Sequence, residues 1–422
     1  MSIEKKNEKG SKKQLDELIK ELLRENFLEL SKDKDAKLGS GSFGDVYEVH
    51  KINTKNTNML LQEKVHKYAL KIIKIDKSEK SKSEIPYEKR KNQINRELSL
   101  SLNIKHHNII RTKQVFQKED DNLGGVFCIL MEKAIFPNLY FLLKSLHSKT
   151  KKENKLNLLI FEIIKNEGIK EESKNFGWFT RINEHFANFL IKQIFLGIEF
   201  LHRNHVIHFD MKPGNILITK DMQLKICDFT LTTFLNLDKK DDKYYLSSGT
   251  FPFMGPEYFS KNREIDKPSA PKVDIFALGV ILLQFFYADP FKENGIAFYN
   301  SRKERPEQEE IEKRIDQVLE RIKKDNNLSK ECKDVLSLLL QKNINDRKTI
   351  YEILNENWVK QQNEEFNNIL HTNDDLTTKF IIETMKCGKV NIKNNLNKQN
   401  TYTYKKGFAK IKAKFQLPRI IN

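Results

Sequence analysis

The chain has 422 residues, and its 75 lysines and arginines against 58 aspartates and glutamates give it a formal net charge of +17. Its four cysteines are too few and too scattered for a disulfide framework, and no window approaches the ~18 apolar residues that a membrane span needs. We therefore expect an intracellular protein, cytoplasmic or nuclear, without a membrane span. Lysine is abundant throughout rather than gathered in one stripe, so we do not expect nucleic acid as a partner.

An amphipathic helix is predicted over residues 11–25. Its apolar residues recur at helical spacing, at Leu15, Leu18, Ile19, Leu22 and Leu23. This face either packs on the domain that follows or docks a partner, and packing is the preferred interpretation.

A glycine-rich segment follows, from Leu38 to Val46. Gly39, Gly41 and Gly44 give it the pattern G-x-G-x-x-G-x-V. Glycine has no Cβ, so backbone N–H groups in such a segment can lie close over phosphates. Short glycine patterns also arise by chance, so this one needs support from the rest of the chain.

Lys71 lies in a run that reads as a buried strand, residues 68–73. Glu97 lies in a helical-looking run, residues 92–102. An ion pair between these two side chains is plausible, and it would orient the lysine toward the α- and β-phosphates of a nucleotide.

Residues 208–215 carry the most informative chemistry, because Asp210, Lys212 and Asn215 stand at fixed offsets ahead of an apolar run. Phosphoryl transfer needs an acceptor for the proton of the nucleophilic hydroxyl, a cation beside the migrating group and a hard oxygen ligand for Mg²⁺. The three residues suit these roles in that order.

Two further motifs complete the series. Residues 224–230 read as a strand that ends at Asp228, and Gly249 and Thr250 precede a Pro256-Glu257 corner. Five matches in one order are hard to attribute to chance.

In this order the motifs resemble those of the eukaryotic protein kinase family, over roughly residues 33–358. The resemblance implies an α+β, bilobal protein kinase fold with ATP and Mg²⁺ bound between the lobes. The N-lobe would be β-rich with one key helix, and the C-lobe mainly helical. The implied divisions are an N-terminal extension at 1–32, the N-lobe and hinge at 33–134, the C-lobe at 135–358 with an insertion at about 147–176, and a basic tail at 359–422.

The resemblance also assigns roles to single residues. Asp210 and Lys212 would be catalytic, with Thr250 beside them, and Asn215 and Asp228 would hold magnesium. The residues expected around ATP are Leu38, Gly39, Gly41, Gly44, Val46, Ala69, Lys71, Glu97, Met131, Glu132, Ala134 and Leu217.

Other residues receive structural roles by the same resemblance. Arg347 would pair with Glu257, and His208 would pack and form hydrogen bonds rather than act as a base. The histidines and cysteines form no close cluster with metal-ligand spacing, so no zinc site is expected.

Several positions depart from the family pattern. Ser101 and Thr112 fall, by counting, at two positions of the apolar column that normally links the lobes. The other departures are Phe209 for arginine, Thr230 for glycine, Phe253 for tyrosine and Gly255 for alanine.

Two hypotheses follow. The first is an active ATP-dependent serine/threonine kinase with protein substrates, favoured because all the polar groups that the chemistry needs are present. The second is a pseudokinase that binds ATP or acts as a scaffold. Without an arginine at 209 we expect activity that does not depend on loop phosphorylation. A regulatory partner would bind at the N-terminal helix, the insertion or the tail.

Overall fold

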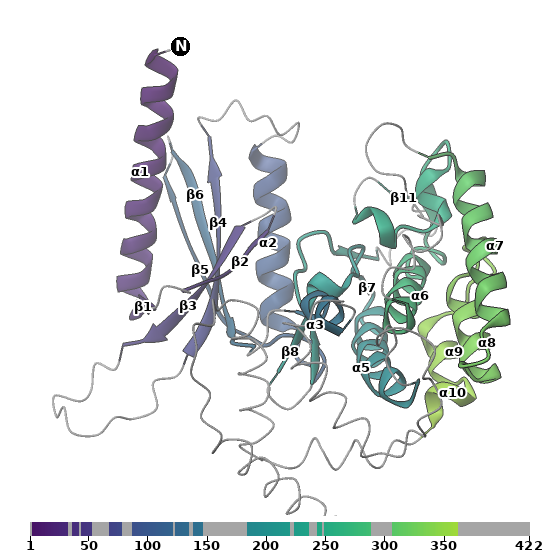
Figure 1. Cartoon of the computed structure of the whole chain (residues 1–422). Helices are drawn as coiled ribbons and strands as arrows, with labels where there is room; N and C mark the ends of the chain where they lie inside the picture. Colours follow the sequence, from purple (N-terminus) through teal and green to yellow (C-terminus); the bar gives the residue numbers. More distant parts are fainter. Residues whose placement is uncertain are drawn as a thin grey trace, which may run out of the picture.

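The computed structural model describes residues 2–32, 36–41, 44–52, 67–77, 87–120, 123–134, 138–146, 184–219, 223–235, 243–246, 249–287 and 306–361. These residues form an N-terminal part built on an antiparallel sheet and a mostly helical C-terminal part, which lie side by side (Figure 1). This α+β architecture confirms the predicted fold class. The predicted insertion at 147–176 and the tail beyond residue 361 lie outside the described residues.

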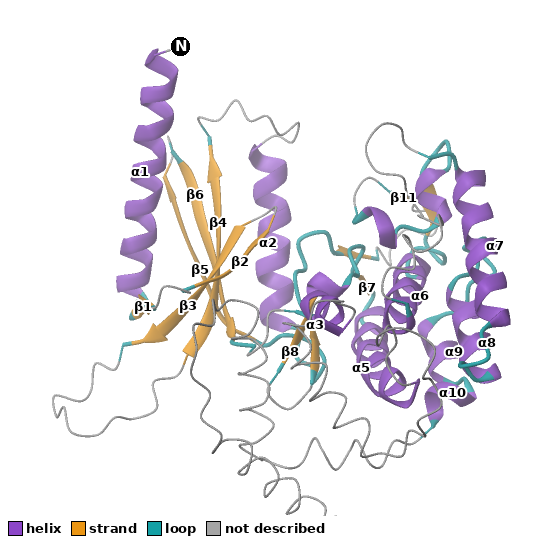
Figure 2. Ribbon diagram, viewed as in Figure 1, coloured by secondary structure: helices purple, strands orange, loops and turns teal. Residues whose placement is uncertain are grey.

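The N-terminal sheet has six strands in the order β1-β3-β4-β6-β5, with β2 paired to β3. The sheet has a helix on either side, so both of its faces are covered (Figure 2). Successive apolar residues along its strands point to opposite faces, and they form a buried cluster on each face. The strands are β1 (Leu28–Leu30), β2 (Lys37–Gly41), β3 (Gly44–Lys51), β4 (Lys67–Asp76), β5 (Thr112–Asp120) and β6 (Gly124–Glu132).

Helix α2 (Tyr87–Asn103) covers the face of the sheet that is turned toward the C-terminal part (Figure 1). Ile94 and Leu98, four residues apart and therefore on one face of the helix, pack with Ile73 and Phe127 of the sheet. Glu97 is also on the buried side of the helix and is only 2% exposed. The packing of α2 thus carries a carboxylate into the protein interior.

Helix α1 (Ser2–Glu25) covers the opposite face of the sheet (Figure 1). Leu15, Ile19, Leu22 and Leu23 are buried there in one apolar cluster with residues of β3, β4 and β6. The helix begins at Ser2, earlier than the predicted residue 11. The prediction began too late because the first turns of the helix lack the apolar spacing on which it relied. The preferred interpretation, packing on the domain, agrees with this arrangement.

The C-terminal part is organised around α6 (Lys272–Phe286), which is buried along almost its whole length. It packs with α5 (Glu184–Arg203) and α8 (Lys330–Leu339) in one large apolar core. The other helices are α3 (Leu139–Leu146), α7 (Gln308–Lys324), α9 (Ile350–Leu354) and α10 (Asn357–Lys360).

Short strand pairs and turns of 3-10 helix lie between α5 and α6. β8 pairs with β9, and β9 ends at Ile226, two residues before the predicted end of this strand at Asp228. The strands are β7 (Val206–Ile207), β8 (Ile216–Ile218), β9 (Leu224–Ile226), β10 (Thr233–Phe234), β11 (Lys243–Tyr245) and β12 (Glu264–Asp266), and the 3-10 turns are η1 (Pro213–Asn215), η2 (Phe251–Phe253) and η3 (Pro256–Phe259). Among the described residues, no helix is long and apolar enough to cross a membrane.

Candidate active site

The segment between β7 and β8 is hydrogen-bonded to Asp274, a buried residue in the first turn of α6. The backbone N–H groups of His208 and Phe209 each donate to the Asp274 carboxylate at 2.9 Å, and the ring of His202 lies at the same distance. Phe209 has a φ of 62°, a backbone angle that residues other than glycine rarely adopt. These bonds fix the backbone that presents Asp210.

The ring of His208 joins this segment to the one that carries Asp228. Its Nδ1 accepts a hydrogen bond from the backbone N–H of Asp210, and its Nε2 lies 3.3 Å from the backbone oxygen of Cys227. With Nδ1 as the acceptor, Nε2 is the nitrogen that donates to the Cys227 oxygen. The residue is fully buried, in agreement with the predicted packing role.

Four of the predicted residues form a hydrogen-bonded cluster around the Asp210 carboxylate. Lys212 Nζ lies 2.6 Å from Oδ2, and the Thr250 hydroxyl donates to Oδ1 at 2.6 Å. Lys212 Nζ also donates to Thr250 Oγ1 at 2.7 Å, and the Asn215 amide donates to the backbone oxygen of Asp210 at 2.8 Å and to its Oδ2 at 3.1 Å. Asp210 is therefore an oriented carboxylate beside a fixed cation.

A second cluster surrounds Lys71 on β4. Its ammonium donates to Glu97 Oε1 at 2.7 Å, to Asp228 Oδ1 at 2.9 Å and to Thr230 Oγ1 at 3.1 Å. The predicted Lys71–Glu97 ion pair is thus present and buried. Burial alone would lower the pKa of Lys71, but the charges of Glu97 and Asp228 outweigh it and raise the pKa above its ordinary value.

Asp228 is held as a carboxylate. Burial alone would raise its pKa, but the charge of Lys71 and the hydrogen bonds from Thr230 and Lys71 outweigh it and lower the pKa to about 2. Its backbone has a φ of 67°, again in the left-handed region. The neighbouring ring of Phe229 is buried and lies 5.6 Å from that of His208, measured between centroids.

The chemistry of Asn215 and Asp228 fits a magnesium ion. Asn215 makes both of its side-chain bonds through its amide nitrogen, so its oxygen is left as an acceptor. At Asp228 the hydrogen bonds from Lys71 and Thr230 both go to Oδ1, which leaves Oδ2. Two hard oxygens suit Mg²⁺, which in nucleotide sites usually takes one or two protein oxygens and completes its shell with phosphates and water. Among the described residues no group of three or more His, Cys, Asp or Glu could hold a metal by itself.

The residues expected around the nucleotide base lie on adjacent strands. Val46 of β3 is opposite Lys71 of β4, and Ala69 of β4 is opposite Met131 of β6. Leu217 comes from β8 in the C-terminal part and is half-buried. Strand pairing therefore brings together the N-lobe members of the predicted set, and the β8–β9 hairpin supplies the C-lobe member.

The glycines between β2 and β3 have different surroundings. A Cβ added to Gly44 would come within 2.4 Å of the backbone oxygen of Ile72 in the neighbouring strand β4, so only glycine fits at this position. A Cβ at Gly39 would meet nothing within 4 Å. Gly44 is thus needed by the protein itself, whereas the space above Gly39 is open to a ligand.

The hinge after β6 is anchored through a buried carboxylate. Glu48 of β3 accepts a hydrogen bond from Lys133 in the hinge and forms an ion pair with Lys67 at the start of β4, at 2.7 Å. Burial alone would raise the pKa of Glu48, but the two lysines lower it below its usual value. The backbone of Glu132 and Ala134, expected to face adenine, flanks this anchored lysine.

The predicted pair of Glu257 and Arg347 is also present. Arg347 Nη1 and Nη2 each lie 3.0 Å from a different oxygen of Glu257, and both side chains are buried. A Cβ at Gly255 would come within 2.5 Å of both Glu257 oxygens. In this structure, alanine at position 255 would therefore require the Glu257 carboxylate to shift.

The sequence assigns Ser101 and Thr112 by counting to two positions of the apolar column. Ser101 is buried on α2, and Thr112 lies at the start of β5, opposite Met131. The Thr112 hydroxyl oxygen is buried and has no hydrogen-bond partner among the described residues.

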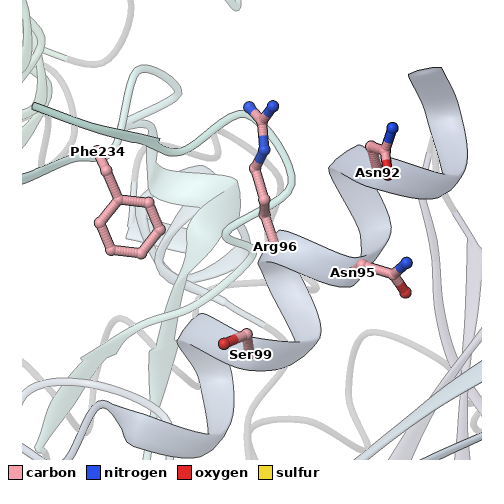
Figure 3. A pocket seen from close by; sticks show the side chains of 5 residues that line it. All are labelled: Asn92, Asn95, Arg96, Ser99 and Phe234. Atoms are coloured by element: carbon pink, nitrogen blue, oxygen red, sulfur yellow. The ribbon is translucent and has the colours of Figure 1, made fainter. Parts of the chain in front are cut away.

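A shallow pocket lies on the outer side of α2, away from Glu97. It is lined by Asn92, Asn95, Arg96 and Ser99 of α2, with the ring of Phe234 from β10 opposite them (Figure 3). Arg96 was not among the site residues predicted from the sequence. The signal was available, since a residue adjacent to the inward-facing Glu97 must face about 100° away on the helix.

The comparisons with known proteins agree with this geometry. A family model described as the protein kinase domain matches residues 33–359. Sperm motility kinase 3A of Mus musculus is 30% identical over 234 residues, which are 55% of this chain and 40% of the relative. Serine/threonine-protein kinase PLK4 of Nematostella vectensis is 29% identical over 174 residues, 41% of this chain and 16% of the relative.

A third relative matches a shorter segment. Serine/threonine-protein kinase chk-1 of Caenorhabditis elegans is 37% identical over 98 residues, 23% of this chain and 19% of the relative. The chain spans less than half the length of each of these three relatives. Because the family model covers more than half of the chain, and the fold and motifs agree with it, the chain belongs to the protein kinase family.

Proposed function

We propose that this chain is an active ATP-dependent protein kinase that transfers the γ-phosphate of ATP to serine and threonine hydroxyls of protein substrates. The observation that carries the proposal is the pair of ordered clusters, one around Asp210 and one around Lys71. A family member that had lost its chemistry would be expected to lack one of these groups.

The roles follow from the contacts. Asp210 would accept the hydrogen bond of the substrate hydroxyl and orient it toward the phosphate, and the Lys212 ammonium would lie beside the transferring group. Lys71, fixed by Glu97, would bind the phosphates, and Asn215 and Asp228 would hold magnesium. Magnesium supplies, when bound, the charge that offsets the phosphates.

Aliphatic hydroxyls are the proposed acceptors. The Thr250 hydroxyl is an aliphatic hydroxyl of this chain, and it already occupies a hydrogen-bonding position on Asp210 Oδ1 at 2.6 Å. Relatives described as serine/threonine-protein kinases support the same class. Acidic or neutral substrate sequences are expected, because a protein of net charge +17 repels basic ones.

The test is phosphate transfer by the purified chain to a degenerate Ser/Thr/Tyr peptide library, with magnesium and radiolabelled ATP, followed by phosphoamino-acid analysis. The Asp210→Asn variant should lose at least about 10³-fold in rate while it still binds ATP, since Asp210 is expected to meet the hydroxyl rather than the nucleotide. Asp316→Asn, an exposed change on α7, is the matched control. Transfer by Asp210→Asn at the parent rate, or phosphotyrosine as the main product, would contradict the proposal.

A pseudokinase is the second candidate, and one observation favours it. The polar residues Ser101 and Thr112 stand in the apolar column, where the Thr112 hydroxyl is buried without a partner among the described residues. ATP binding without any transfer by the parent protein, combined with restored transfer in a Ser101→Leu, Thr112→Leu double variant, would support this alternative.

A further inference from the structure

Thr230 stands where the family usually has glycine, and its side chain lies inside the Lys71 cluster. The residue is buried, and its hydroxyl oxygen lies 2.6 Å from Asp228 Oδ1, 2.8 Å from Glu97 Oε2 and 3.1 Å from Lys71 Nζ. A glycine at this position could make none of these contacts.

The hydrogen-bonding capacity of the hydroxyl defines what it does there. It has one proton, which it can donate to Asp228 or to Glu97, and it accepts from the Lys71 ammonium. Among the described residues, Thr230 is the only partner of Glu97 Oε2, since Lys71 bonds to Oε1. Lys71 is paired with two carboxylates, those of Glu97 and Asp228. The Thr230 hydroxyl adds a second hydrogen-bond donor to this group.

The backbone accommodates threonine at this position. Among the described residues, those other than glycine with a positive φ are Phe27, His205, Phe209, Asp228 and Arg263. Thr230 is not one of them, so a β-branched side chain fits without the left-handed strain that would call for glycine. Threonine also restricts the backbone next to Asp228, which is itself held in the left-handed region.

The contacts have a consequence for the nucleotide-bound protein. Lys71 now bonds to both carboxylates, but in the proposed function its charge is shared with the phosphates. The bond that Thr230 donates to Glu97 Oε2 uses neither Lys71 nor Asp228, so it can persist. It then connects α2 directly to the segment of Asp228.

We propose that Thr230 is a positioning residue whose hydroxyl ties Glu97 of α2 to Asp228 and so keeps both in the arrangement that binds Mg²⁺ and ATP. This inference rests on the proposed function. Under it, the substitution of the usual glycine is a support for the site rather than a defect of it.

The test compares Thr230→Val, which keeps the shape but removes the hydroxyl, with Thr230→Ser, which keeps the hydroxyl. ATP binding is measured by calorimetry with magnesium and, separately, with EDTA. Thr230→Val should weaken binding in magnesium about tenfold, as expected for loss of a hydrogen bond to a charged group, and affect binding in EDTA less. Thr230→Ser should stay within about twofold of the parent in both conditions.

A second measurement needs no nucleotide. Hydrogen exchange of the α2 amides around Glu97 should be about tenfold faster in Thr230→Val than in the parent, and unchanged in Thr230→Ser. Equal exchange and equal ATP binding in the parent and Thr230→Val would overturn the inference, as would a serine variant that behaves like valine. A parent protein that binds no ATP would overturn the proposed function as well, whereas a parent that binds and transfers while Thr230→Val matches it overturns the inference alone.

Discussion

Truncation of Leu22 should show that α1 is part of the folded kinase domain, although the family match begins only at residue 33. Leu22 is 2% exposed and belongs to the apolar cluster between α1 and the sheet. Leu→Ala changes at buried sites cost about 2–5 kcal/mol, and a site on a single covering helix can relax, so we expect about 2–3 kcal/mol. At roughly 2–4 °C for each kcal/mol, Tm should fall by about 4–12 °C.

Thermal unfolding of the purified protein measures this shift, with Gln14→Ala as the matched control. Gln14 lies on the same helix, is exposed, and is replaced by an equally good helix former, so its Tm should change by less than about 2 °C. Hydrogen exchange of the β6 amides should rise in Leu22→Ala and not in the control. A Leu22→Ala protein that melts within 1 °C of the parent would refute the packing argument.

Two further predictions concern the stability of the fold. Gly44→Ala should lower Tm strongly, because the added Cβ would collide with the backbone of Ile72. Gly39→Ala should leave Tm within about 2 °C of the parent. Equal melting of the two variants would contradict the argument that β4 leaves no room for a Cβ at position 44. Arg347→Ala should cost about 3–5 kcal/mol, since it leaves the buried Glu257 carboxylate without its bidentate partner. Urea unfolding checks this, and a cost below 1 kcal/mol would show that the pair is dispensable.

The motifs could be predicted from the sequence because each is local and their order along the chain is restrictive. The Lys71–Glu97 pair and the Glu257–Arg347 pair are both present, although each joins residues far apart in the sequence. The Glu257–Arg347 pair was predicted from the family pattern, whereas the Lys71–Glu97 pair was predicted from a lysine in a buried strand and a glutamate in a helical run.

Other features could not be predicted in this way. Thr230 was recognised only as a departure from glycine, because the contact of its hydroxyl depends on Glu97, 133 residues away in the sequence. The start of α1 was placed too late, since the helix gains its stability from packing at Leu15 to Leu23 and its polar first turns carry no periodic signal.

The close approach at Gly255 has a consequence for engineering this protein toward its family consensus. Replacing glycine by the residue that relatives carry commonly stabilises a protein, partly by reducing the freedom of the unfolded chain. Here the added methyl group would have to displace the Glu257 carboxylate from Arg347, and that carboxylate cannot swing away without leaving a buried cation unpaired. A consensus library of this protein should therefore keep glycine at position 255.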